Sequence, residues 1–154
     1  MALAVIISLY ISIGILSAAG SIYISQRVLP VRLEAVVFGL FLVPIAGFYL
    51  AFAAYFGEHA AFSLETPAVI AFAVLGCLGT RVPIALIAGY ALHGVWDLLH
   101  EIHAHSGTDV FGGWESTQIP LAYGAFCAAY DLAMAVYFFS RRSQWKSAWA
   151  ARGG

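Results

Sequence analysis

Charged side chains are scarce in this sequence. Aspartate, glutamate, lysine and arginine together make up 10% of its 154 residues, and hydrophobic residues make up 62%. A soluble domain carries roughly 25% charged residues, so the composition is that of an integral membrane protein. The formal net charge is −1, and without a basic excess we expect no nucleic-acid partner.

Cysteine is also rare, and no cation precedes the first apolar run. Cys77 and Cys127 are far apart and form no Cys-x-x-Cys motif, which argues against a thiol-disulfide exchanger and favours buried, inert thiols. The first run has no positively charged segment before it. We therefore interpret that run as a membrane anchor with its N-terminus outside, not as a cleaved signal peptide.

Long apolar runs, in contrast, are abundant. About 20 apolar residues are needed to cross the hydrocarbon core of a bilayer. The sequence predicts an all-α, polytopic membrane protein of about five transmembrane helices, forming one domain over residues 1–154. The expected spans are about 2–24, 33–56, 62–80, 82–103 and 119–140. The third is the shortest, and a re-entrant segment remains an alternative for it. Pro67 is expected in its first helical turn, where a missing N–H costs nothing.

The placement of basic residues predicts the orientation. In the five-helix arrangement all seven lie on one side: Arg27, Arg32, Arg81, Arg141, Arg142, Lys146 and Arg152. The positive-inside rule then places the N-terminus outside and residues 141–154 in the cytoplasm as a basic tail. Loop acids are expected on the outer side: Glu58, Glu65, Asp109 and Glu115. For Glu34, two residues from Arg32, we expect a local or interfacial pairing. The predicted location is the bacterial inner (plasma) membrane.

The most informative motif is His93-Gly-Val-Trp-Asp97-Leu-Leu-His100. At 100° per residue, His93, Asp97 and His100 fall within about 60° of one another on a helix. An ionised aspartate near the bilayer centre costs about 2.5–3.5 kcal/mol on insertion scales. A partner must offset that cost, so the motif predicts a functional site within the membrane.

Asp131 on the next predicted span is the expected partner. Counted at 1.5 Å per residue from the outer ends of their spans, His93 lies about 15 Å deep and Asp131 about 18 Å deep. Gly124, Cys127 and Ala135 share the face of Asp131, and small residues let two helices approach closely. Tyr123 and Tyr130 flank that face as hydrogen-bond donors.

Three interpretations of these residues remain open. In the first, His93, Asp97, His100 and Asp131 bind a divalent metal, with Zn, Fe or Mn suited to the mixed imidazole and carboxylate donors. The protein is then a metal-dependent enzyme, a hydrolase or oxidase acting on a lipid or lipophilic substrate, with His93 and Asp97 as catalytic groups. In the second, they form a metal-free proton or ion pathway. In the third, they only hold two helices together, in a membrane subunit of a larger complex. A pore in so small a chain would require a homo-oligomer.

Other polar residues are expected near the outer end of this site. His103 is a candidate extra ligand or part of a route for ions, and the alternative is a hydrated helix end. Residues 106–117 form either a lid or an ordinary loop. Trp96 is expected to pack beside the site, and Tyr49 is expected to serve packing.

The C-terminal third also carries a resemblance. His93-x-x-Trp96-Asp97-x-x-His100, followed by Cys127-x-x-x-Asp131, resembles the pattern of a family of small bacterial membrane proteins of unknown function. The resemblance implies that these six residues belong to one site and implies no particular reaction. The arrangement is also similar to that of ceramidase-type intramembrane zinc amidases, without their full motif set.

Overall fold

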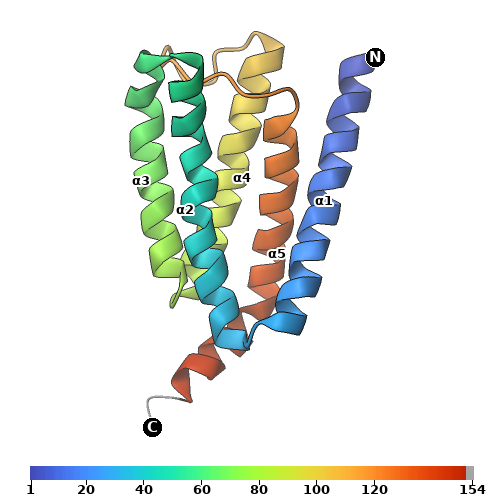
Figure 1. The fold of residues 1–154 in the computed structure, drawn as a ribbon, viewed down its shortest axis with the longest axis vertical. Coiled ribbons are helices and arrows are strands. Elements are labelled where there is room, and N and C mark those ends of the chain that lie inside the picture. The colour runs from blue at the N-terminus through green and yellow to red at the C-terminus, as the bar shows by residue number, and fades with distance from the viewer. Residues whose placement is uncertain (152–154) are drawn as a thin grey trace.

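The computed structural model describes residues 1–151 and consists of five long helices and one short 3₁₀ turn. The helices are α1 (Ala2–Val28), α2 (Val31–Phe56), α3 (Phe62–Gly79), α4 (Pro83–Ser106) and α5 (Tyr123–Ala150), with the turn η1 (His59–Ala61) before α3. All five run along the long axis of the molecule (Figure 1). The predicted all-α class is confirmed.

Three helical segments are long and apolar enough to cross a membrane: α1, α2 and the η1–α3 segment His59–Gly79. Helix α3 is continuous over 18 residues. Pro67 is its sixth residue, so the prediction that Pro67 lies in the first turn is wrong. The helix begins earlier because η1 leads directly into it, and Pro67 leaves the carbonyl of Ser63 without an intrahelical donor.

Helix α5 differs most from its predicted bounds. It begins at Tyr123 and not at residue 119, because Ala122 adopts a left-handed conformation (φ 59°) and Tyr123 N–H closes a turn onto Pro120 O. It continues to Ala150, well past residue 140. Most of the expected tail is therefore helical, and Arg152 lies outside the described residues.

The helices form an open bundle. Helix α4 packs along α5, α3 packs on α2 and α4, and α1 packs mainly on α5. Helix α1 stands at one edge of the bundle and α3 at the other (Figure 1). The core is centred where α2, α4 and α5 meet, around Leu42, Leu86, Tyr90 and Phe138.

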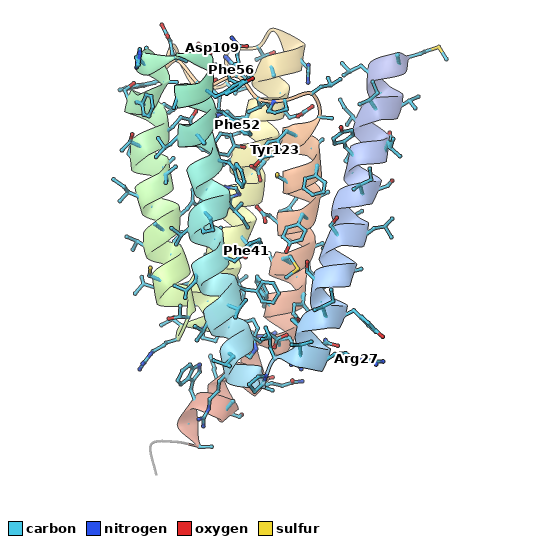
Figure 2. The ribbon with its side chains drawn as sticks, viewed as in Figure 1. Arg27, Phe41, Phe52, Phe56, Asp109 and Tyr123 are labelled. Carbon is cyan, nitrogen blue, oxygen red and sulfur yellow. The ribbon has the colours of Figure 1, made fainter. Side chains whose placement is uncertain are left out.

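The two ends of the bundle differ in charge. Arg32 and Arg81 both lie over the Trp149 ring, at 5.8 and 5.2 Å from its centroid. These contacts join the start of α2 and the turn between α3 and α4 to the end of α5. Arg27 lies at this end and Asp109 at the other (Figure 2). The described basic residues thus gather at one end of the bundle, as the sequence predicts.

Candidate functional site

Helix α4 carries the motif that the sequence singled out. It starts at Pro83, whose missing N–H needs no partner there, and ends before Gly107, which takes the left-handed conformation (φ 68°) that glycine adopts without strain. His93, Asp97 and His100 lie on one inward-facing stripe of this helix and are at most 1% exposed.

Three residues form the centre of the site, and we call His93, Asp97 and Asp131 the central group. His93 Nδ1 lies 2.6 Å from Asp131 Oδ2 on α5 and 3.1 Å from Asp97 Oδ2, one turn along α4. The Tyr49 hydroxyl on α2 donates to Asp97 Oδ1 at 2.5 Å. The predicted pairing of His93 with Asp131 is therefore present.

Glycines let α4 and α5 approach closely enough for this pairing. A Cβ atom on Gly124 would lie 2.4 Å from the carbonyl oxygen of Asp97. A Cβ on Gly94 would lie 3.1 Å from Leu132 Cγ and 3.3 Å from Asp131 Cβ. Only glycine fits at Gly124 without a shift of backbone, which agrees with the expected role of small residues on this face.

The central group has the donor set and spacing of a metal site. One ligand atom from each residue can be chosen so that all lie within 4.8 Å of one another. Atoms that bind one ion at about 2.1 Å lie about 3.0 Å apart in octahedral and about 3.4 Å apart in tetrahedral geometry. The two His93 distances bracket the octahedral value, so small side-chain shifts would admit an ion.

Unpartnered atoms point to the same conclusion. His93 Nε2, Asp97 Oδ2 and Asp131 Oδ1 are buried without an aligned hydrogen-bond partner among residues 1–151. Buried polar atoms are normally satisfied. The carboxylate atoms Asp97 Oδ2 and Asp131 Oδ1 are therefore available to a metal ion bound beside His93.

His100 lies outside the central group. Its Nε2 is 2.9 Å from Glu65 Oε1 on α3, and its Nδ1 is 3.0 Å from the carbonyl oxygen of Trp96. Both ring nitrogens are therefore engaged elsewhere, and the structure does not bring His100 together with the three candidate ligands. Trp96 packs beside His100 with ring centroids 5.2 Å apart, as expected.

Glu65 is not an outer loop acid. It lies in the first turn of α3 and is fully buried. Its Oε1 accepts from the backbone N–H of Thr117 at 3.2 Å in addition to contacting His100. The sequence interpretation failed because the partner of Glu65 lies 35 residues away on another helix.

The loop between α4 and α5 covers the site at the end of the bundle opposite the basic residues. The Phe111 ring lies 4.8 Å from the His100 ring and 5.4 Å from the His103 ring, measured between centroids. Glu58 holds the far end of the loop through the N–H of Gln118 at 2.8 Å and the hydroxyl of Thr117 at 3.0 Å. His103 thus packs under this loop and away from the central group.

An apolar cavity of about 390 Å³ reaches the central group from the side of the bundle. It lies between α1, α2 and α5, and Phe41 and Phe48 at its wall are about half exposed. Four predicted site residues line it: Tyr123, Cys127, Tyr130 and Asp131. Asp131 therefore belongs both to the central group and to a cavity that opens on the surface of the bundle.

Another buried carboxylate lies at the basic end. Glu34, 1% exposed, accepts from Arg141 at 3.0 Å, from Trp145 Nε1 at 2.9 Å and from the Tyr137 hydroxyl. The expected pairing with Arg32 is wrong, because α5 extends far enough to bring Arg141 and Trp145 to Glu34 while Arg32 contacts the end of α5.

Tyr49 is the functional candidate to which the sequence interpretation gave too little weight. The sequence predicts a packing role, whereas in the structure its hydroxyl is the hydrogen-bond partner of Asp97. No local pattern around Tyr49 marks it. Only its depth in the second predicted span could have indicated this contact, because an intramembrane aspartate such as Asp97 needs a hydrogen-bond donor at the same depth.

Comparisons with protein-family models, with curated proteins and with solved structures gave no match to this chain.

Proposed function

We propose that this chain is an integral membrane protein with five transmembrane helices, its N-terminus outside and its C-terminus in the cytoplasm, in a bacterial plasma membrane. Three apolar helices support this. Helices α4 and α5 are less apolar because they carry the central group and the basic C-terminal turns, and the central group is turned into the bundle. The gathering of cations at one end supports the orientation.

Within that frame we infer a metal-dependent enzyme, a hydrolase or oxidase that acts on a lipid or lipophilic substrate. His93, Asp97 and Asp131 are the proposed ligands, and membership of the small bacterial family named above is part of the same proposal. The observation that supports this inference best is that Asp131 contacts His93 and also lines the apolar cavity. A substrate can reach this point from the bilayer without crossing water.

The residues of the chain have separate tasks in this proposal. A divalent ion held here supplies Lewis acidity and lowers the pKa of bound water. Tyr49 holds Asp97 in position through its hydroxyl, which is the orienting role of partners behind metal ligands. Asp97 acts as ligand or general base, and the loop at Phe111 keeps bulk water from the outer side.

Metal content tests the proposal directly. We would purify the protein in detergent and measure bound metals by mass spectrometry for the wild type, His93→Gln and His100→Gln. These matched variants change the same residue type on the same stripe of α4. We expect near-stoichiometric metal in the wild type and in His100→Gln, and a loss of at least about tenfold in His93→Gln.

Two results contradict the proposal. One is a wild-type protein that stays metal-free after incubation with Zn²⁺, Fe²⁺ or Mn²⁺. The other is equal metal in His93→Gln and the wild type, provided that circular dichroism and size-exclusion profiles show all variants folded. If His100→Gln alone loses metal, the ligand set above is wrong.

A metal-free proton pathway is the second candidate, and one observation favours it. Four side chains form a continuous line of polar contacts, in the order Tyr49, Asp97, His93 and Asp131. The polar atoms of successive side chains lie within 3.1 Å of each other. Proton uptake by vesicles containing the protein under an imposed pH gradient tests this. Uptake that Asp131→Asn abolishes, in metal-free protein, favours the pathway over the enzyme.

A further inference from the structure

The central group lies near the middle of the proposed membrane span. His93 is ten residues from the start of α4, roughly 15 Å, and thirteen from its end, roughly 20 Å. Asp131 is eight residues, roughly 12 Å, from the start of α5. With a hydrocarbon core about 30 Å thick, both residues lie close to the bilayer midplane.

The cavity at Asp131 continues toward the basic end of the bundle. A second cavity of about 310 Å³ follows it between α1 and α2 and ends at Leu29. The two cavities share Ser21, Phe41 and Tyr130 as lining residues. The two cavities are therefore adjacent, and we treat them together as one elongated cleft, which we call the α1–α2 cleft. Figure 2 shows Phe41 well below Tyr123 along the long axis, so the cleft extends over much of the bundle.

The part of the cleft between the site and the basic end is close to one leaflet in length. Along α2 its lining runs from Ile45 to Val37, eight residues or roughly 12 Å, and half of the hydrocarbon core is about 15 Å. Ile45, Phe41 and Val37 line this length of α2. A single extended hydrocarbon chain fits such a lining in both length and polarity.

Polar groups in the cleft are few and mostly satisfied. The Tyr130 hydroxyl donates to Ser21 Oγ at 3.2 Å, and Ser25 donates to Glu34 at 3.2 Å. Asp131 differs because its Oδ1 is buried and unpartnered. The polar end of a bound molecule would therefore be placed at Asp131, beside His93.

We propose that the α1–α2 cleft binds a neutral single-chain lipid, such as a long-chain alcohol, with its weakly polar end at Asp131 and its chain directed toward Leu29. A glycerophospholipid does not fit, because its charged headgroup holds the ester bonds at the interface, far from the midplane. A hydroxyl is far less costly to bring to the midplane than a phosphate. The inference rests on the proposed function and names its substrate class.

Photolabelling in vesicles tests the proposal. We would reconstitute the protein and add either a long-chain alcohol or a phosphatidylcholine, each with a diazirine at mid-chain, and map the labelled residues by mass spectrometry. We expect the alcohol to label Phe41, Ile45 and Tyr130 and an excess of unlabelled alcohol to suppress this labelling. The phosphatidylcholine should label the outward-facing positions of all helices without preference.

Matched tryptophan variants locate the binding. Ile45→Trp fills the cleft beside the site, and Val37→Trp fills its far half. Leu40→Trp, on the same helix, alters an exposed side chain that lines neither cavity. We expect cleft labelling by the alcohol to fall at least about tenfold in the first two variants and to be unchanged in the third.

Three results would overturn the proposal. They are non-saturable labelling by the alcohol, equal cleft labelling by the phosphatidylcholine, and unchanged labelling in both cleft variants. Metal content, measured on the same samples, separates this proposal from the proposed function. Metal without cleft labelling refutes the substrate class alone, whereas saturable labelling of a metal-free protein refutes the metalloenzyme and leaves the lipid site.

Discussion

Replacing Gly124 by alanine is the sharpest test of how the central group is assembled. The added Cβ would lie 2.4 Å from Asp97 O and 2.9 Å from Glu101 Cβ. An ordinary contact is at least about 3.4 Å, so α4 and α5 must separate by about 1 Å at this height. His93 and Asp131 lie one to two turns farther along the same two helices, are 2.6 Å apart and would move out of hydrogen-bond range.

Two quantities follow from this separation. Overpacking of a tight contact costs about 1–3 kcal/mol of unfolding free energy, offset by about 1 kcal/mol of helix propensity. Metal sites tolerate only about ±0.2 Å in ligand distance. We therefore expect a net loss of about 0–2 kcal/mol in stability and a larger loss, of about 10–100-fold, in metal affinity.

The assay combines an unfolding titration in mixed micelles with a metal-binding isotherm. Gly20→Ala is the control, because no atom lies within 4 Å of the Cβ it would add. Gly94→Ala should give an intermediate loss of metal affinity, since its closest contact is 3.1 Å. If Gly124→Ala binds metal as tightly as Gly20→Ala, the close approach of α4 and α5 does not hold the ligands in place.

Three further predictions follow. Tyr49→Phe removes the hydrogen bond to Asp97 and should cost about 1–3 kcal/mol in stability, measured by the same unfolding titration. A metal affinity equal to that of the wild type would contradict the proposal that Tyr49 orients Asp97. Arg141→Met leaves the carboxylate of Glu34 buried without its cation and should cost about 3 kcal/mol, and a double variant that also carries Glu34→Gln should recover most of the loss. Removal of metal with a chelator should destabilise the wild type by about 2.7 kcal/mol relative to the same protein with free metal at 100 times its Kd. The loss should appear as a lowered thermal midpoint of unfolding. An unchanged midpoint would show that no metal contributes to the fold.

The sequence predicts the parts of the structure that depend on local patterns or on depth along a helix. Apolar runs give five helices, and the comparable depths of His93 and Asp131 predict their contact, because consecutive antiparallel helices bring equal heights together. The stripe on α4 also follows from helical periodicity alone.

The parts that failed depend on long-range pairing. His100 shares the helical stripe of His93, yet its ring nitrogens are taken by Glu65 and by the carbonyl oxygen of Trp96. The helical periodicity of the sequence cannot predict a partner that lies 35 residues away on α3. The start of α5 was misplaced for a similar reason, since the backbone of residues 117 and 118 is held by carboxylates of distant acids.

The buried carboxylate of Glu34 has a consequence for biosynthesis. Glu34 belongs to the second helix to leave the ribosome, but its main donors, Arg141 and Trp145, belong to the last. N-terminal segments emerge first during synthesis, so this carboxylate stays without those partners until α5 has been made. The same helix supplies Asp131 to His93, so a chain that stops before Asp131 has neither the ion pair nor the site.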